Sequence, residues 1–391
     1  MTSLSNRNEI YSHTALRGIA ALMVVLVHFR SFFHPSIDPD EVTFFLMKGY
    51  LWVDFFFILS GFVMSYVYVI EHPERRNFSE IAHYLIARIA RVYPLHLMSL
   101  ATVLLFFMIV SLISWNQKEE FCCVFDGSLR TAESLLANLF LIHAWGMFDW
   151  VTWNLPSWSL SSEFFCYLIF AGLLAMDGYA RKLALIALSC IVLIYYGFSL
   201  ATGDDIDENF RLSIVRAISA FSIGILLFLG RRMVITLSEK CLTSIQIATD
   251  VTLLLSLHFG VADVISISLM AVVVLVTWED RGILSNWLAA RSLHTLGLFS
   301  YSIYMWHYLI KYIGLEDWES FIGLPVQSSI LGSVIFVACL TVTVIPIAVW
   351  SYRSVEMPAR KWVSLRLTCL LEARYALVST ESANKSMLVT N

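Results

Sequence analysis

Charged residues are scarce in this chain of 391 residues. Lysine, arginine, aspartate and glutamate together make up 14% of the sequence, whereas 58% of it is hydrophobic. A soluble domain averages about 25% charged residues. A soluble core stops growing near roughly 250 to 300 residues and its surface must stay polar, so one soluble domain cannot accommodate this much apolar material. The composition therefore predicts that the lipid bilayer is the solvent of the protein.

Three signatures are missing from the sequence: a basic surplus, a phosphate loop and a pattern of cysteines. The net charge of −4 provides no basic surface for nucleic acid, and no glycine-rich loop is present that would cradle nucleotide phosphates. The seven cysteines show neither metal-ligand spacing nor a disulfide framework. We therefore expect no nucleic-acid partner, no nucleotide hydrolysis and no metal.

Apolar stretches of about 20 residues, the length that crosses a bilayer as a helix, recur along the chain. They predict ten spans, at residues 14–33, 44–70, 84–113, 157–176, 183–200, 211–229, 242–259, 262–278, 296–314 and 328–350. The first lacks the small-residue cleavage site of a secretory peptide, so we expect it to be retained. Residues 132–148 are expected to form a re-entrant or interfacial segment, with an eleventh span as the alternative.

The expected fold is therefore all-α, a polytopic transmembrane helix bundle. We expect one membrane domain over residues 1–361 and a cytoplasmic, partly disordered tail over residues 362–391. Basic residues such as Arg181 and Lys182 fall in every second connection, and acidic residues such as Asp38 fall in the others. Because basic residues favour cytoplasmic loops, this alternation predicts that both termini are cytoplasmic.

Arg17 and His28 are ionisable residues inside the first predicted span. Such residues are costly in the bilayer and usually face a cavity or a partner. Eleven residues of helix rise about 16 Å and make nearly three turns, so both side chains share a face, with Arg17 at the cytoplasmic end. The alternatives are a histidine satisfied by a neighbouring carbonyl group and an arginine that snorkels to the interface.

The second and third spans carry further charges. Asp54 lies among aromatic residues and needs a donor, so it acts either in catalysis or as the partner of a basic group, and Gly61 after it permits close helix approach. Arg88 and Arg91 lie three residues apart on one helix face at the cytoplasmic boundary. This spacing suits bidentate binding of phosphate groups, and membrane anchoring is the alternative.

A last set of polar residues lies near the fourth, ninth and tenth spans. Glu163 enters an apolar run without a basic neighbour in sequence and can orient a histidine or contact a sugar hydroxyl. The aromatic ring of Trp158 beside it can stack on a sugar. His307 is a second buried imidazole, and Arg360 lies at the inner face.

In this order, these elements resemble the acyltransferase-3 family of integral membrane acyltransferases. The matching elements are Arg17 with His28, WVDFFFILSG (52–61), RIARVYPLH (88–96), WSLSSEFFCY (158–167), SYSIYMWH (300–307) and EMPARK (356–361). They run over nearly the whole chain. Each is weak alone, whereas six in order are specific.

The resemblance implies an acyl donor, usually acetyl-CoA, and transfer of its acyl group to a hydroxyl of a surface polysaccharide or lipid-linked glycan at the bacterial inner membrane. It also implies that Arg17 and His28 are essential and that Arg88 and Arg91 correspond to the paired arginines of the family. Some members carry an esterase-like domain that completes the transfer outside. We expect no such domain in this chain, so a partner protein or a homo-oligomer stays open.

From the residues and the resemblance together we hypothesise that Arg17, Arg88, Arg91 and Arg360 hold the phosphates of coenzyme A at the inner face. The pantetheine arm then brings the thioester to His28, which deprotonates the acceptor or carries the acyl group.

Asp54 or Glu163 is expected to fix the tautomer of His28. The residues expected to contact the carbohydrate acceptor are Trp158, Ser159, Tyr304 and His307. Two other classes of protein stay open: a proton-coupled transporter, whose inverted repeats we do not find, and a multispan structural or receptor protein.

Overall fold

The computed structural model describes residues 9–33, 37–72, 74–117, 130–150, 152–203, 205–207, 212–315 and 329–389. Over these residues the chain forms helices and turns and contains no β-strand, which confirms the predicted all-α class. The helices are α1 (Tyr11–Phe29), α2 (Leu51–Val67), α3 (Phe78–Gln117), α4 (Ala132–Leu139), α5 (Ser157–Ala175), α6 (Gly178–Thr202), α7 (Ser213–Gly230), α8 (Arg232–Ile235), α9 (Glu239–His258), α10 (Asp263–Thr277), α11 (Ile283–Leu288), α12 (Arg291–Leu298), α13 (Ser300–Leu315), α15 (Ile330–Ser351) and α16 (Met357–Val389).

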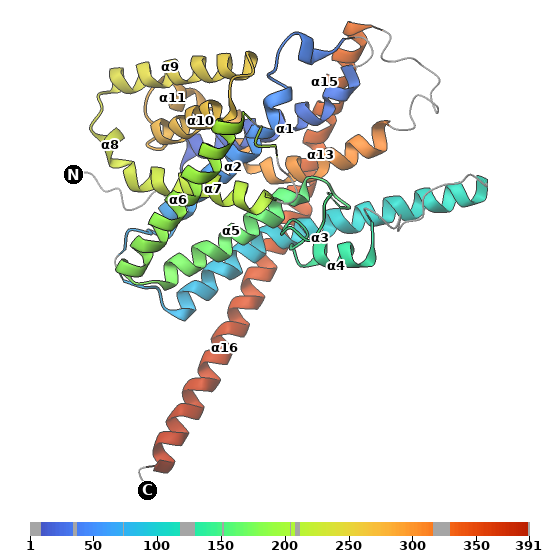
Figure 1. Cartoon of the computed structure of the whole chain (residues 1–391). Helices are drawn as coiled ribbons and strands as arrows, with labels where there is room; N and C mark the ends of the chain where they lie inside the picture. The colour runs from blue at the N-terminus through green and yellow to red at the C-terminus, as the bar shows by residue number, and fades with distance from the viewer. Residues whose placement is uncertain are drawn as a thin grey trace.

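The long helices pack into a bundle from which α16 runs outward (Figure 1). Eight helical segments in the described part of the chain are long and apolar enough to cross a membrane. The shorter helices α10 and α13 occupy the two other predicted spans. In the described part of the chain, a helix therefore lies at the position of each predicted span, in agreement with the expected number of about ten. The helix α16 continues across residue 361. The domain boundary expected at this residue and the partly disordered tail expected after it stay predictions.

Residues 132–148 do not form an eleventh span. The helix α4 has only eight residues and is followed by turns, whereas a helical crossing takes about 20 residues. Buried polar groups fix this segment: His143 Nε2 lies 3.1 Å from Ser157 Oγ, and His96 Nε2 lies 2.8 Å from the Asn138 carbonyl oxygen. Burial lowers the pKa of His143 to about 3, so this ring is neutral at physiological pH.

Two glycines bring α2 and α7 into direct backbone contact. A Cβ atom on Gly61 would meet the carbonyl oxygen of Phe221 at 2.0 Å, and one on Gly224 would meet that of Ile58 at 2.1 Å. Small residues at membrane helix interfaces allow such close packing. The predicted role of Gly61 is therefore confirmed, and its counterpart is Gly224.

A second glycine pair joins α1 to α12. A Cβ atom on Gly18 would meet the backbone nitrogen of Gly297 at 2.7 Å, and one on Gly297 would meet the carbonyl oxygen of Thr14 at 1.9 Å. Arg17 precedes the first of these glycines, and α13 begins three residues after the second. The contact therefore sets the position of Arg17 relative to α13.

A buried ion pair lies at the α2–α7 interface, about two helical turns from Gly61 and Gly224. Asp54 Oδ2 accepts a hydrogen bond of 2.7 Å from Arg216 Nη2, and both side chains are fully buried. Arg216 also donates to the Tyr50 carbonyl oxygen at 3.0 Å and to Asp207 Oδ1 at 3.3 Å. The guanidinium is thus satisfied on all sides, as a charge inside an apolar bundle requires.

We expect Gly224→Ala to lower the free energy of unfolding by about 1 to 3 kcal/mol, because its methyl group has no space against the α2 backbone. The matched control is Gly172→Ala in α5, where a Cβ atom meets nothing within 4 Å. Thermal unfolding of the detergent-purified protein measures both. An unchanged Gly224→Ala variant would show that the close contact contributes little.

We expect Asp54→Asn and Arg216→Met each to destabilise the protein by about 3 to 5 kcal/mol, because each leaves one buried charge without its partner. The double variant Asp54→Leu with Arg216→Met should recover part of this loss, since no unpaired charge remains in the interface. Thermal unfolding again provides the measurement. A stable but catalytically inactive Asp54→Asn variant would contradict the structural role.

Candidate active site

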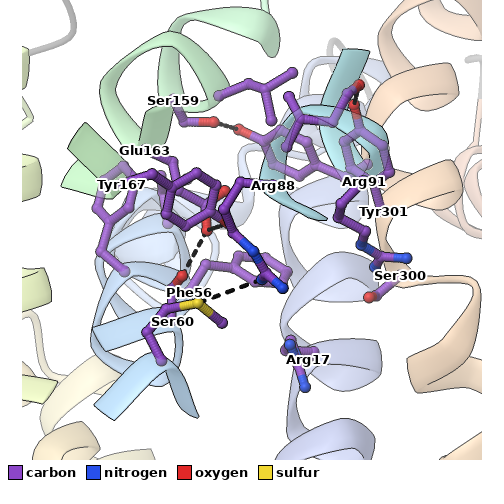
Figure 2. A pocket seen from close by; sticks show the side chains of 16 residues that line it. Arg17, Phe56, Ser60, Arg88, Arg91, Ser159, Glu163, Tyr167, Ser300 and Tyr301 are labelled. Carbon is purple, nitrogen blue, oxygen red and sulfur yellow. Dashed lines mark hydrogen bonds between the residues drawn. The ribbon is translucent and has the colours of Figure 1, made fainter. Parts of the chain in front are cut away.

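A cavity lies inside the bundle among α1, α2, α3, α5 and α13. Its volume is about 120 Å³, which is room for several water molecules. The polar side chains that line it are Arg17, Ser60, Arg88, Arg91, Ser159, Glu163, Tyr167, Ser300, Tyr301 and Tyr304. Figure 2 shows Arg17, Arg88 and Arg91 on one side of this space and Ser159 at its opposite end.

Arg88 lies in a cage of three tyrosines. The rings of Tyr68, Tyr84 and Tyr167 have their centroids 5.8, 6.0 and 5.8 Å from the guanidinium carbon, which stabilises the cation through their π faces. Its hydrogen bonds are weak, at 3.3 Å to Met64 Sδ and 3.5 Å to the Tyr68 hydroxyl. The buried Nε has no partner in the described part of the chain. Arg88 therefore keeps donors that an anionic ligand can use.

Arg91 differs from Arg88 because it already has a carboxylate partner. Its Nη1 donates to Glu356 Oε1, and Ser302 Oγ donates to Glu356 Oε2 at 2.8 Å. Glu356 ends a π-helical turn (Tyr352–Glu356) between α15 and α16, a feature that often occurs at functional sites. The buried carboxylate of Glu356 therefore balances one of the two arginine charges on α3.

Arg17 completes the basic side of the cavity. Among the described residues it has no hydrogen bond and no ion pair, although Arg91, Glu163 and Tyr167 act on it electrostatically. Arg360 lies close enough to act on Arg88 and Arg91 but does not line the cavity. The structure therefore brings together three of the four arginines predicted to bind the donor.

Glu163 is the acidic residue among the cavity-lining side chains. Its Oε1 accepts two hydrogen bonds of 2.7 Å, from Ser60 Oγ and from the Tyr167 hydroxyl. Its Oε2 has no hydrogen-bond partner within the residues that the structure describes, and neither oxygen contacts a histidine there. Glu163 thus faces the arginines rather than His28, and the predicted orientation of His28 by Glu163 finds no contact to support it.

Ser159 and Tyr304 form the far end of the cavity. Their hydroxyl oxygens lie 2.7 Å apart, and Ser159 Oγ also donates to the Pro156 carbonyl oxygen at 3.1 Å. Since the single hydroxyl hydrogen of Ser159 is used there, Tyr304 is the donor between the two. Phe56 packs edge to face on Tyr304 at 5.9 Å, so these two rings form the wall at this end.

His28 and His307 lie together beyond this wall. Their ring centroids are 5.0 Å apart, and His307 Nδ1 lies 2.6 Å from the carbonyl oxygen of Tyr304. Neither histidine lines the cavity. His28 therefore lies apart from the arginines, as the predicted separation of eleven helical residues from Arg17 requires, and delivery of a thioester to His28 stays a prediction.

Two predicted site residues, Asp54 and Trp158, instead contact Arg216 of the buried ion pair. Asp54 bonds Arg216, so its alternative role as the partner of a basic group describes the contact observed. Trp158 lies with its ring 5.3 Å from the Arg216 guanidinium carbon and is buried, so it offers no exposed surface to a sugar. Arg216 was not predicted, although a lone arginine in the apolar run SIVRAISAFSIG was a usable signal.

Comparisons with known proteins identify the family of this chain. The family model described as Acyltransferase domain matches residues 10–353. The acyltransferase MdmB of Streptomyces mycarofaciens is 31% identical over 166 residues, covering 41% of this chain and 38% of that protein. Protein 2 in the picA locus of Rhizobium radiobacter is 38% identical over 96 residues, covering 24% of this chain and 43% of that protein.

A third relative matches over most of its length. The exopolysaccharide production protein ExoZ of Rhizobium meliloti is 25% identical over 332 residues, covering 83% of this chain and 94% of that protein. No solved structure matches the chain. Because the family model covers most of the sequence, from the start of α1 to the end of α15, the chain belongs to the acyltransferase-3 family of integral membrane acyltransferases.

Proposed function

We propose that the protein is an O-acyltransferase that moves an acyl group, most simply acetyl, from an acyl-CoA to a hydroxyl of a surface polysaccharide or lipid-linked glycan. The observation that carries this proposal is the group of three arginines at one intramembrane cavity, two of which lack a carboxylate partner among the described residues. The name of the relative ExoZ, an exopolysaccharide production protein, supports a carbohydrate acceptor.

The arginine side of the cavity fits the phosphates of coenzyme A. Arg17 has no hydrogen bond in the described chain, and Arg88 has an unpartnered buried Nε. Charge-assisted bonds from guanidinium groups to phosphate are short and strong. Arg91 is held by Glu356, so it contributes to the potential of the site while its position stays fixed.

The cavity as it stands is smaller than its substrate requires. Its volume is about 120 Å³, whereas sites for ligands of drug size measure roughly 300 to 1,000 Å³. Phe56 and Tyr304 separate it from His28. Binding of an acyl-CoA therefore has to widen the cavity at this wall before the thioester reaches the imidazole.

His28 is the base of the proposed reaction. The acceptor hydroxyl oxygen forms a bond to the acyl carbon while His28 takes the hydroxyl proton, and the bond between the acyl carbon and sulfur breaks. The proton then passes from His28 to the thiolate, which leaves as coenzyme A thiol. The products are an ester and a thiol, and His28 is neutral again.

The proton relay of a transporter finds no support in the geometry. A relay needs its ionisable side chains to be in contact. Asp54 is instead bonded to Arg216, and Glu163 contacts Ser60 and Tyr167. In the described part of the chain neither carboxylate contacts His28 or His307.

The proposal includes an orientation of the protein in the membrane. Both termini lie in the cytoplasm and the protein resides in a bacterial inner membrane, so that acyl-CoA enters at the arginine side and the acceptor meets His28 from the opposite leaflet. Membrane lipid surrounds the bundle. The identity of a partner protein or a second copy stays a prediction.

We expect His28→Ala to abolish transfer of label from radiolabelled acetyl-CoA to glycan, because the acceptor loses its base. The assay uses membrane vesicles of a gene-deleted host that expresses the chain. His258→Ala is the matched control, since this histidine is exposed at the end of α9. Full activity of a correctly inserted His28→Ala variant would overturn the proposed mechanism.

We expect Arg88→Gln to weaken binding of coenzyme A by about 10-fold to 100-fold, as the loss of charge-assisted hydrogen bonds predicts. Isothermal titration calorimetry of the detergent-purified protein with coenzyme A measures the affinity. Arg291→Gln at the exposed start of α12 should leave it unchanged. Equal affinities of the wild type, the Arg88→Gln variant and the Arg291→Gln variant would exclude Arg88 from the donor site.

A further inference from the structure

His28 and His307 pack against each other where α1 contacts α13. The planes of the two rings are inclined by 31°, and Tyr308 stands edge-on to His28 at 5.2 Å. The charged groups that act on His28 are Lys311 and Arg30, and both are cationic. Within the residues that the structure describes, no carboxylate contacts either ring, so the usual orienting partner of a catalytic histidine is absent from this pair.

The contacts of His307 determine which of its nitrogens carries the hydrogen. Nδ1 lies 2.6 Å from the carbonyl oxygen of Tyr304, and a carbonyl oxygen can only accept, so Nδ1 is the donor in the neutral ring. Nε2 is then left with a lone pair. It is buried and has no hydrogen-bond partner in the described chain, and an unmet buried acceptor is costly.

The direction of Nε2 follows from the same bond. Because Nδ1 is held against the backbone of its own helix, Nε2 on the other side of the ring points away from α13. His28 on α1 is the neighbouring imidazole at 5.0 Å. The final side-chain torsion of histidine is broad, and rotation of His28 about this torsion is the movement that a hydrogen bond to this acceptor requires.

We infer that His307 is the positioning residue of His28: its Nε2 accepts an N–H of His28 and thereby leaves the other His28 nitrogen with its lone pair toward the acceptor hydroxyl. This inference rests on the proposed acyl transfer. His28 is the partly exposed member of the pair and His307 is fully buried. His28 therefore meets the substrate, and His307 acts through it.

The arrangement also suits the proton balance of the reaction. When His28 takes the proton of the acceptor hydroxyl, its N–H bond to Nε2 becomes charge-assisted and strengthens. When His28 returns the proton to the departing thiolate, both rings are neutral again. A neutral partner therefore stabilises the transient imidazolium without leaving a permanent charge in the apolar bundle.

Two substitutions at His307 separate the positioning role from a structural one. Gln places an acceptor oxygen near the position of Nε2, whereas Asn keeps a donor near Nδ1 for the Tyr304 carbonyl group and removes the Nε2 acceptor. We expect His307→Gln to keep kcat within about 10-fold and His307→Asn to lose at least about 100-fold, a typical effect of acid–base groups. The KM for acetyl-CoA should change by less than about 3-fold, because the arginine side is untouched.

The test uses the full chain in vesicles, radiolabelled acetyl-CoA and the glycans of the host membrane. His96→Gln is the matched control: His96 is also buried, with one nitrogen on a carbonyl group and the other unpartnered, but it does not contact His28, and kcat should stay within about 2-fold of wild type. The double variant His28→Ala with His307→Asn should be no slower than His28→Ala, as expected for groups that act as a unit.

Each result has a separate meaning. Equal loss in both His307 variants overturns the positioning role, because the Gln variant keeps an acceptor near Nε2. An Asn variant more active than the Gln variant overturns it too and indicates that the Tyr304 contact is what matters. An Asn variant with wild-type kcat overturns it as well. If the wild-type chain itself transfers no label, the proposed function fails, independently of His307.

Discussion

The architecture depends on the backbone contact between α2 and α7, where Gly61 and Gly224 leave no room for side chains. Helices in lipid gain little from the hydrophobic effect between them, so close packing has to supply the attraction. The same contact aligns Asp54 with Arg216 and seals both from solvent. It also fixes the face of α2 that carries Ser60 and Met64 into the cavity.

The four arginines at the α2–α7 ion pair and at the cavity fall into two groups that differ in their partners. Arg216 and Arg91 are each bonded to a buried carboxylate, Asp54 and Glu356. Arg17 and Arg88 have no such partner in the described chain. A bilayer protein that leaves two cations unpaired beside a cavity carries a cost that paired charges avoid. The unpaired arginines are therefore where an anionic ligand gains most, and this distinction supports the proposed donor side.

Much of the fold could be predicted because hydropathy is a local property of the sequence. The spans follow from runs of apolar residues, and the non-spanning segment around α4 follows from the alternation of charge between the connections. Arg88 with Arg91 follows from helical spacing. The partner of Asp54 could not be predicted. The sequence shows that a buried carboxylate needs a donor, but Arg216 lies 162 positions away, and only the packing of α2 on α7 selects it.

The same limit applies to the histidines. His28 and His307 were each identified as buried imidazoles, yet nothing in their spacing placed them in contact. Trp158 was expected at a sugar site because tryptophan commonly stacks on glycans, but its ring is used by Arg216. Sequence patterns thus identified which residues are costly to bury, whereas the tertiary structure determined which of them satisfy one another.

Tyr304 stands between the two halves of the site and serves each with a different atom. Its hydroxyl bonds Ser159 at the end of the cavity, and its backbone carbonyl oxygen holds Nδ1 of His307. A side chain can rotate while the carbonyl group, fixed within α13, stays in place. The wall between the arginines and His28 can therefore open by rotation of the Tyr304 ring without loss of the contact that fixes the tautomer of His307. In the proposed reaction, access for the thioester and orientation of the histidine pair thus depend on two different groups of Tyr304, its ring and its backbone carbonyl group.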